Sequence, residues 1–388
     1  GFLGTLTLLR RLKMTKVVRV GRRYHFSLME PGWPSPAYDR MIAKGGLNLG
    51  ASGSPAKEQI DLAVLGITRT CPYRCAHCYE RYNLGDRDVV SAGRWSEAVR
   101  ELQDIGVSVI ALSGGEPLGA MDRTLEILRG ADKSRSDFHL YTAGCGATAE
   151  TVGRLVEAGL AAAAVGLDDF EPARHDRLRN RRGAFQEALH AIELFSRAGI
   201  LVYANTCLTH ELVREDGLLR FYELARGLGL GAIQLLEPRP CGGYAGGVSP
   251  PFGDEDRAAV RRFFAVAQDG RRYRAYPAVY HPAWFEAPEN LGCLMAGLSH
   301  LYIDSLGNVE PCVFLPVAFG NIRAEPFTAI YARMRRAVPR PIREACPAVA
   351  LAARVGFGSD KPLPLPYESL AAEWPGQLRA SASPGRTT

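Results

Sequence analysis

The chain has 388 residues, of which 47% are hydrophobic and 23% are charged, and its formal net charge is +6. These values are ordinary for a globular protein and allow one large domain with additions, or two domains. The mild basic excess is only weak evidence for an acidic partner, because the arginines are scattered along the chain, and we do not expect a nucleic-acid partner. No window holds the roughly 20 consecutive apolar residues that a membrane-spanning helix needs.

Residues 1–14, GFLGTLTLLRRLKM, combine a short apolar run with basic residues that follow it. A secretory signal carries its basic residues first, so this segment does not resemble one. We expect a docking helix here, with an amphipathic helix that contacts a membrane surface as the alternative. Nine cysteines without a secretory signal indicate the reducing cytoplasm, where clustered cysteines bind metals more often than they form disulfides.

Strand-like apolar runs alternate with helical patterns between residues 60 and 238. The predicted strands cover residues 60–68, 107–117, 138–144, 161–169, 200–209 and 232–238. The predicted helices cover residues 91–106, 121–130, 148–159, 183–199 and 217–229. This alternation is typical of an α/β protein with a parallel sheet. Six units favour a partial, TIM-like (β/α)6 barrel over a closed eightfold barrel.

The alternation stops at a Gly- and Pro-rich stretch, RPCGGYAGGVSPPFGD, at residues 239–254. Beyond it, residues 300–314 predict a hairpin that turns near Gly307 and Asn308. The Pro- and Ser-rich end of the chain predicts partial disorder. The predicted domains are an N-terminal appendage (1–58), the partial barrel (59–245), a small C-terminal module (246–358) and a tail (359–388).

Three cysteines, Cys71, Cys75 and Cys78, follow the first predicted strand in the pattern C-x3-C-x2-C. The loop after a barrel strand lies at the C-terminal mouth, where active sites form. A structural zinc site needs four ligands in C-x2–4-C pairs; no second pair lies nearby, and His77 adjoins Cys78 too closely to share its tetrahedron. An iron–sulfur cluster is therefore the better interpretation, and three thiolates on four irons would leave one iron open.

The cysteine pattern, together with SGGEP at residues 113–117 after the second strand, resembles the signature of the radical S-adenosylmethionine (SAM) enzymes. The resemblance covers about residues 60–238. It implies that Cys71, Cys75 and Cys78 hold a catalytic [4Fe–4S] cluster whose open iron is chelated by SAM. It further implies reductive cleavage of SAM to a 5′-deoxyadenosyl radical, which abstracts hydrogen from an unactivated C–H bond. A flavodoxin or ferredoxin would be the electron donor.

The same resemblance assigns cofactor contacts to the SGGEP motif, ending at Pro117. Gly114 and Gly115 lack side chains, so their backbone can approach the methionine moiety of SAM. Glu116 would accept a charge-assisted hydrogen bond from the ammonium group of SAM. A plain turn is the alternative interpretation of this motif taken alone.

A later segment, GLDDFEPARHDRLR, resembles the family's sequence after its fourth strand. The matching residues are Asp168, His175, Asp176 and Arg179. Asp168 and Arg179 are predicted to contact SAM, Arg179 through its carboxylate, with a surface ion pair as the alternative role of Arg179. Three positions depart from the family pattern: Gly166 replaces a common Ser, Asp169 replaces Gly, and YTAG at 141–144 lacks the usual Asn.

Residues 292–312 end in G-x4-C and resemble the family's auxiliary-cluster extension, in its long (SPASM) or short (twitch) form. The long form needs a later C-x2-C-x5-C-x3-C block, which is absent, so the short form is the better match. An auxiliary iron–sulfur cluster held by Cys293, Cys312 and Cys346 is the resulting prediction. Either Cys241 completes the set or one iron is open; three unrelated cysteines are the alternative.

The sequence thus predicts a radical SAM enzyme that oxidatively modifies a peptide or a small metabolite. No side chain is predicted to act as a direct catalyst, because SAM supplies the radical and the protein binds and orients the reactants. Cys145 and Cys207, in or beside predicted strands, are interpreted as small buried packing residues. The alternative function is a non-catalytic iron–sulfur or zinc scaffold, which would not need the SGGEP motif.

Overall fold

The structure, a computed structural model, describes residues 16–46, 60–247, 252–357 and 363–374. The helix predicted for residues 1–14 lies outside these described residues. None of the helices in the described part of the chain combines the length and the apolar character needed to cross a membrane.

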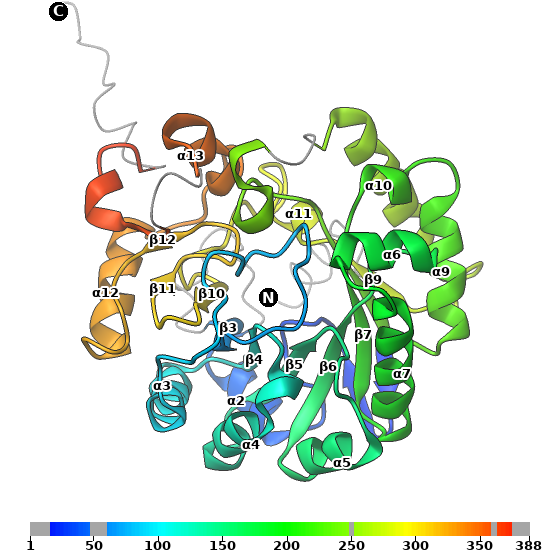
Figure 1. Cartoon of the computed structure of the whole chain (residues 1–388), viewed down its shortest axis with the longest axis horizontal. Coiled ribbons are helices and arrows are strands. Elements are labelled where there is room, and N and C mark those ends of the chain that lie inside the picture. The colour runs from blue at the N-terminus through cyan, green and yellow to red at the C-terminus, as the bar shows by residue number, and fades with distance from the viewer. Residues whose placement is uncertain (1–15, 47–59, 248–251, 358–362, 375–388) are drawn as a thin grey trace, which may run out of the picture.

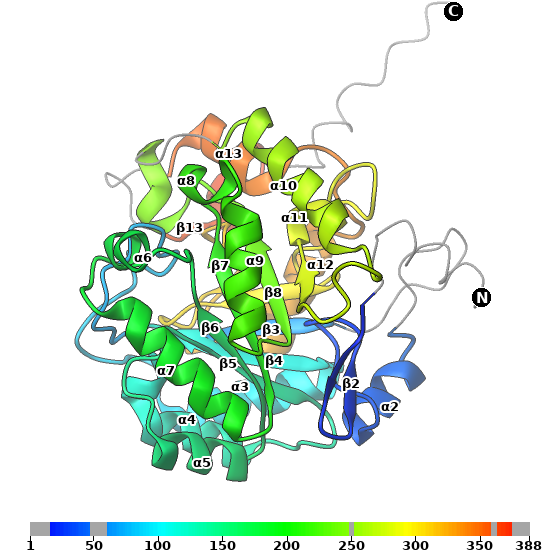
Figure 2. The same cartoon turned by 90° about the vertical axis from the view of Figure 1, so that its right-hand side faces the viewer.

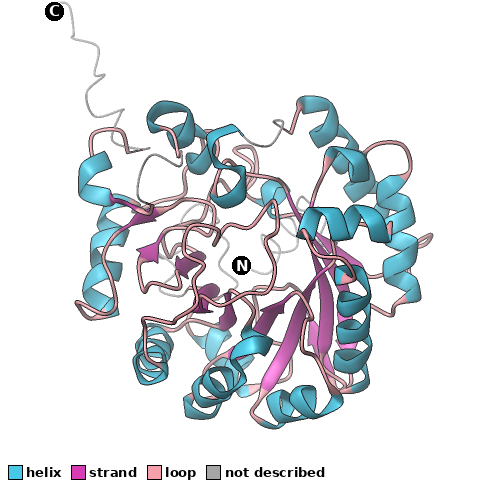
Figure 3. Cartoon of the chain, in the orientation of Figure 1, coloured by secondary structure: helices cyan, strands magenta, loops and turns pink. Residues whose placement is uncertain are grey.

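A nine-stranded sheet forms the curved wall of an open barrel, in the order β11-β10-β3-β4-β5-β6-β7-β8-β9 (Figure 1). Its six central strands are parallel, as predicted: β3 (Leu62–Thr68), β4 (Val109–Gly114), β5 (Asp137–Thr142), β6 (Leu160–Gly166), β7 (Leu201–Cys207) and β8 (Ala232–Leu236). The connecting helices lie outside this wall (Figure 3): α3 (Ala92–Ile105), α4 (Met121–Gly130), α5 (Ala149–Glu157), α6 (Pro172–Arg179), α7 (Ala184–Arg197) and α9 (Gly217–Gly227). The predicted partial (β/α)6 barrel is confirmed.

Helix α3 illustrates why these segments fold against the sheet. Its N-cap residue, Ser91, accepts a hydrogen bond from the backbone N–H of Arg94, and Gly106 ends the helix with a φ of 97°. Trp95 and Leu102 lie on its inner face and are fully buried in the core between helices and sheet. Complete burial of such a side chain stabilises the fold by about 1.5–3 kcal/mol.

The sheet extends beyond the six predicted strands at both edges. β9 (Ala278–Tyr280) pairs in parallel with β8, and β10 (His300–Ile303) pairs in parallel with β3. β11 (Val309–Glu310) pairs antiparallel with β10 across a turn at Gly307, which confirms the predicted hairpin. Strands this short have little periodicity of their own, and their partners are distant in the sequence. Residues assigned to a separate C-terminal module therefore complete the barrel wall.

The N-terminal elements close the bottom of the barrel, as the dark-blue segment in Figure 2 shows. The Asp137 carboxylate, at the start of β5, accepts hydrogen bonds from Arg23 Nη1 (3.1 Å) and from the backbone N–H of Gly32 (3.0 Å). Leu28 packs with Ala162 inside the barrel. These contacts lie at the amino ends of the strands, opposite the mouth where the cysteine loop begins.

The C-terminal residues also pack onto the barrel. In the predicted tail, β13 (Leu365–Pro366) pairs with β12 (Val317–Ala318), and the fully buried Trp374 lies 5.3 Å from Phe319 between ring centroids. The other elements are β1 (Val18–Val20), β2 (Arg23–His25), α2 (Pro36–Ala43), η1 (Pro117–Ala120), α8 (His210–Val213), η2 (Gly242–Gly247), α10 (Asp254–Ala267), α11 (Pro282–Phe285), α12 (Phe327–Ala337), α13 (Pro347–Val355) and η3 (Tyr367–Leu370).

Candidate active site

A hollow lies at the mouth of the barrel, where the central strands end. Of the predicted site residues, it is lined by Cys71, Cys75, Cys78, Gly114, Gly115, Asp168 and Arg179. The sequence analysis missed Tyr141, Asn205, Glu237 and Arg239, and it interpreted Cys207 as a packing residue, yet all five line the same hollow. Glu237 and Arg239 lie at or just past the end of a predicted strand, which was a signal that could have found them, whereas Tyr141, Asn205 and Cys207 lie within predicted strands.

A larger cavity of about 720 Å³ lies at the opposite end of the barrel, between residues 16–21 and the turns before β7, β8 and β9. Its lining contains no cysteine and no carboxylate side chain among the described residues. The chemistry of the lining residues therefore favours the mouth as the reactive site.

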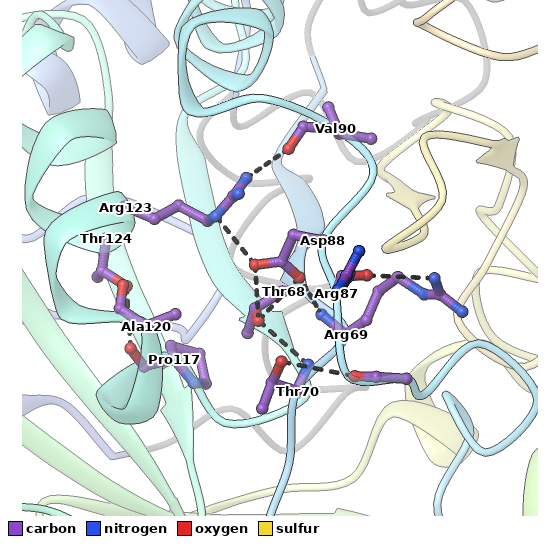
Figure 4. Close-up of polar contacts among 11 residues, drawn as sticks. Thr68, Arg69, Thr70, Arg87, Asp88, Val90, Pro117, Ala120, Arg123 and Thr124 are labelled. Carbon is purple, nitrogen blue, oxygen red and sulfur yellow. Dashed lines mark hydrogen bonds and ion pairs between the residues drawn. The ribbon is translucent and has the colours of Figure 1, made fainter.

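The cysteine loop, residues 69–90, leaves β3 and returns to α3, and Asp88 joins its two ends (Figure 4). The Asp88 carboxylate accepts hydrogen bonds from the Thr68 hydroxyl (3.1 Å) and from the backbone N–H of Arg69 (2.7 Å). It also pairs with Arg123 Nε of α4 at 3.2 Å, and Arg123 in turn donates to the carbonyl oxygen of Val90. These contacts hold the loop against the barrel.

Replacing Asp88 with alanine is expected to lower the free energy of unfolding by about 1–3 kcal/mol, because three partly buried donors would lose their acceptor. Chemical denaturation of the purified protein measures the change. Asp86→Ala, at an exposed position of the same loop, is the matched control and should change stability by less than about 0.5 kcal/mol. Equal losses in the two variants would contradict this role of Asp88.

The middle of the cysteine loop contacts three other parts of the chain. The backbone N–H of Ala76 donates to the carbonyl oxygen of Leu178 in α6 (2.9 Å). The backbone N–H of Gly243 donates to the carbonyl oxygen of Cys78 (2.8 Å). On the opposite side, the hydroxyl of Ser305, in the β10–β11 turn, donates to buried Glu80 (2.6 Å). The loop is thus held in place by contacts with α6, the Gly242–Gly243 segment and the β10–β11 turn.

The three thiols of the loop fit an iron–sulfur cluster. All three are free, and burial raises their pKa values, that of Cys71 to about 12. Coordination to iron removes the thiol protons and balances the buried negative charge. The loop offers three thiols and no fourth cysteine, a donor set that fits an iron–sulfur cluster with one open iron.

The SGGEP residues pack against the start of the cysteine loop through their backbone. Gly115 and Glu116 donate their N–H groups to the carbonyl oxygens of Thr68 (2.7 Å) and Thr70 (2.8 Å). A Cβ atom would lie 2.5 Å from the Thr68 oxygen at Gly114 and 2.1 Å from the Thr70 oxygen at Gly115. Glycine is therefore required here by the neighbouring backbone, whether or not SAM is bound.

Glu116 has three protein partners. Its carboxylate accepts hydrogen bonds from the Thr142 hydroxyl (2.6 Å) and from the backbone N–H groups of Ala143 (2.8 Å) and Leu118 (3.0 Å). Burial outweighs these contacts and raises the pKa of Glu116 to about 7. Glu116 thus links the ends of β4 and β5, and neither it nor Pro117, which begins η1, lines the hollow. Their contact with SAM stays a prediction.

Asp168 and Arg179 form a buried ion pair in the wall of the hollow. Arg179 Nε lies 2.7 Å from Asp168 Oδ2, and the other carboxylate oxygen accepts the N–H of Cys207 at 2.9 Å. Although burial alone would raise it, the Arg179 charge holds the pKa of Asp168 at about 2. Arg179 is only 9% exposed, so the alternative of a surface ion pair is wrong.

The same arginine explains why Gly166 departs from the family pattern. A Cβ atom at Gly166 would lie 2.2 Å from Arg179 Nη2 and 2.7 Å from its Cζ. The guanidinium therefore fills the space that a serine side chain would need. In this chain, the Arg179 guanidinium therefore packs directly against Gly166 at the end of β6.

The other two matched residues shape the connection between α6 and α7. The backbone N–H of Asp168 donates to His175 Nδ1 (3.1 Å). The Asp176 carboxylate accepts the N–H groups of Gly183 (2.6 Å) and Phe185 (2.9 Å). These contacts hold α6 in place, and thereby Arg179 at its end.

A second group of cysteines, Cys293, Cys312 and Cys346, lies beside the β10–β11 edge. Cys293 and Ile342 exchange two backbone hydrogen bonds (2.7 and 3.1 Å). Cys346 directly precedes α13. Burial raises the pKa of Cys293, and the charges of Glu286, Cys312 and Cys346 add to this effect. The three thiols therefore lie near one another, although their role as ligands stays a prediction.

Two family models match the chain: the radical SAM superfamily over residues 65–221, and an iron–sulfur cluster-binding domain named SPASM over residues 293–348. The first range contains the cysteine loop and the SGGEP motif, and the second contains Cys293, Cys312 and Cys346. The matching domain carries the name of the long form, while the second cysteine block of that form is absent. A single auxiliary cluster therefore stays a prediction.

Characterised relatives share most of the chain. It is 29% identical to an AdoMet-dependent heme synthase of Methanosarcina barkeri over 68% of this chain and 80% of that protein. It is 27% identical to a PqqA peptide cyclase of Streptomyces rochei over 68% of this chain and 70% of that protein. In fold it resembles Streptococcus suis SuiB bound to S-adenosylmethionine (TM-score 0.59, 16% identity, covering 76% of this chain and 68% of SuiB).

The order of motifs along the barrel, the thiols gathered at its mouth and the two family matches lead to one conclusion. The chain belongs to the radical SAM superfamily and is a SPASM-type radical SAM enzyme, which uses a [4Fe–4S] cluster, S-adenosylmethionine and an auxiliary iron–sulfur centre.

Proposed function

We propose that this enzyme abstracts hydrogen from an unactivated C–H bond of a peptide or a small metabolite and completes an oxidation. One observation carries the proposal. A single hollow is lined by Cys71, Cys75 and Cys78 and also by Cys241 and Phe314, the latter two residues after the predicted auxiliary ligand Cys312. A substrate in this hollow would therefore have access to both predicted iron–sulfur sites.

When bound, SAM and the two clusters would supply the radical and an acceptor for the electron left on the substrate. The chain supplies binding and orientation. Gly114 and Gly115 would lie along the methionine moiety of SAM, and Glu116 would accept from its ammonium group. Arg179 would bind the cofactor carboxylate while Asp168 fixes its guanidinium in place.

The interior of the barrel offers both room and polar contacts. Ala164 of β6 lines the hollow beside Gly166, and these small residues leave room inside the wall. Asn205 of β7 and Gln234 of β8 are direct neighbours in the sheet, and the side-chain oxygen of each has no hydrogen-bond partner among the described residues. A buried oxygen without a partner is costly, so these amides suit contact with a polar ligand.

The relatives support both substrate classes. The peptide cyclase favours a peptide, and the heme synthase favours a small molecule. SuiB, similar in fold, has been solved with its precursor peptide. A non-catalytic scaffold is not supported, because these relatives are a synthase and a cyclase.

Deuterium transfer tests the proposal and works with an unidentified substrate. Source cells grown in heavy water give a deuterated extract, which is separated into peptides and small molecules. Each fraction is incubated anaerobically in ordinary water with the enzyme, dithionite and unlabelled SAM. We expect 5′-deoxyadenosine that carries deuterium with one fraction, and mass spectrometry detects it. Protease treatment of the active fraction separates the two substrate classes.

The Cys75→Ala variant, incubated with the same fractions, is the control and should give no labelled product. If 5′-deoxyadenosine forms but carries no deuterium with any fraction, SAM is cleaved without abstraction from a substrate, and the proposal is wrong.

A further inference from the structure

We propose that Cys241 is the fourth thiolate ligand of the auxiliary iron–sulfur centre. The inference rests on that centre and on its predicted ligands Cys293, Cys312 and Cys346, and it does not depend on the hydrogen abstraction proposed above. Cys241 belongs to neither matched family segment, because it lies in the loop after β8. Three observations on its position carry the argument.

The first observation is that the Cys241 loop is fixed against the catalytic cysteine loop. The backbone N–H of Gly243 donates to the carbonyl oxygen of Cys78 at 2.8 Å. A Cβ atom at Gly242 would lie 2.1 Å from this carbonyl oxygen, and one at Gly243 would lie 2.0 Å from that of Ala76. Only glycine permits so close an approach of two backbones. The position of Cys241 is therefore set by direct contact.

The second observation is that Cys241 faces the C-terminal cysteine turn. Its side chain is 5% exposed and lines a small cavity beside the main hollow. That cavity is also lined by Glu310, Val313 and Pro316, which bracket Cys312 in the sequence. The loop thus brings a buried thiol from the barrel to the turn that carries a predicted ligand.

The third observation concerns Cys346. The Arg239 side chain, two residues before Cys241, is 13% exposed and lies within hydrogen-bonding reach of the Cys346 thiol. The backbone N–H of Cys241 donates to the Arg239 carbonyl oxygen at 2.8 Å. One short segment therefore lies beside Cys346 through Arg239 and beside Cys312 through Cys241. A cluster bound by Cys312 and Cys346 would therefore have the Cys241 thiol beside it.

Cys207 lines the same main hollow but lies on the catalytic side. Its N–H donates to Asp168 Oδ1 at 2.9 Å. Burial raises the pKa of its thiol, with the charges of Asp168 and Cys75 adding to this effect. Within the described residues, none of the hydrogen bonds found for Cys207 is to Cys293, Cys312 or Cys346, although its thiol lies near that of Cys241. It is therefore the matched control for Cys241.

Binding of the Cys241 thiol to iron changes the oxidation state of no atom. The S–H bond of Cys241 breaks, its sulfur binds iron, and the proton leaves to solvent. With four thiolates, the auxiliary centre has no open iron. It can then exchange electrons but cannot bind a substrate directly.

The test uses the full chain with Cys71, Cys75 and Cys78 all replaced by alanine, so that only the auxiliary centre can bind iron. After anaerobic reconstitution, this parent variant should hold about four irons. Oxidation with ferricyanide should leave them in place. Adding Cys241→Ala should cause loss of about one iron and produce the EPR signal of a three-iron cluster, because the iron without a thiolate is labile. Adding Cys207→Ala instead should leave the parent's behaviour unchanged.

A second measurement needs no substitution at Cys241. Cyanide binds an open iron, so it should leave the EPR signal of the reduced parent variant unchanged. A signal altered by cyanide would overturn the proposal, as would a Cys241→Ala variant that retains all its iron after oxidation. Neither readout requires hydrogen abstraction, so the two proposals fail independently.

Discussion

Single replacement of Cys71, Cys75 or Cys78 by alanine is expected to abolish the formation of 5′-deoxyadenosine from SAM. Each thiol is one of the three predicted cluster ligands in the wall of the same hollow, and the loop contains no further cysteine. The measurement is anaerobic incubation with dithionite and SAM, followed by chromatography of the nucleoside product.

The fold should survive these substitutions, because the thiols line the mouth and lie outside the main core between helices and sheet. Thermal unfolding followed by circular dichroism checks this point. Cys145→Ala is the matched control, since Cys145 lies beside the loop and contacts Arg181 at 3.6 Å; it should retain cleavage. Cleavage that persists in two of the three loop variants would remove the assignment of these cysteines.

Replacing Asp168 with alanine is expected to cost about 3–5 kcal/mol of unfolding free energy, since it leaves the buried guanidinium of Arg179 without its partner. The backbone N–H of Cys207 would also lose its acceptor. Chemical denaturation of the protein without added SAM measures this loss. Asp168→Asn should be less damaging, because the amide oxygen can still accept one of the two hydrogen bonds.

The exposed pair of Arg177 and Glu211 provides the comparison. Its side chains are 61% and 56% exposed, so Glu211→Ala should cost no more than about 1 kcal/mol. Similar losses of unfolding free energy in Asp168→Ala and Glu211→Ala would show that burial does not make the Asp168–Arg179 ion pair more important for stability than an exposed one. The proposed role of Arg179 would then lose its structural support.

The central strands could be predicted from the sequence because each is an apolar run next to an amphipathic helix. β3 and β6 lie within one or two residues of their predicted starts, for this local pattern depends on no distant partner. The edge strand β9 could not be predicted this way, and β10, although predicted as part of a hairpin, could not be predicted to pair with β3. Each is stabilised by hydrogen bonds to a strand far along the chain, and those contacts leave no local pattern.

The residue types of the site could be predicted from the sequence, but the contacts between its side chains could not. The spacing of the cysteine loop predicted three thiols close together at the mouth, and the structure places all three in the wall of one hollow. The sequence could not show that Glu116 accepts hydrogen bonds from Thr142 and Ala143, or that Arg179 lies against Gly166. These neighbours come from different strands, and only the folded barrel brings their side chains together.

The sequence by itself determined the class of this protein: a parallel barrel with three thiols after its first strand and the SGGEP motif after its second. Hydrophobic periodicity and motif spacing are local properties, so they can be recognised in the sequence without knowledge of the fold. Only the tertiary structure decided that the C-terminal residues complete the barrel wall and that Cys241 lies between the two cysteine groups. The physical reason is close backbone packing: Gly242 and Gly243 bring their loop against the catalytic loop, which lies far away in the sequence.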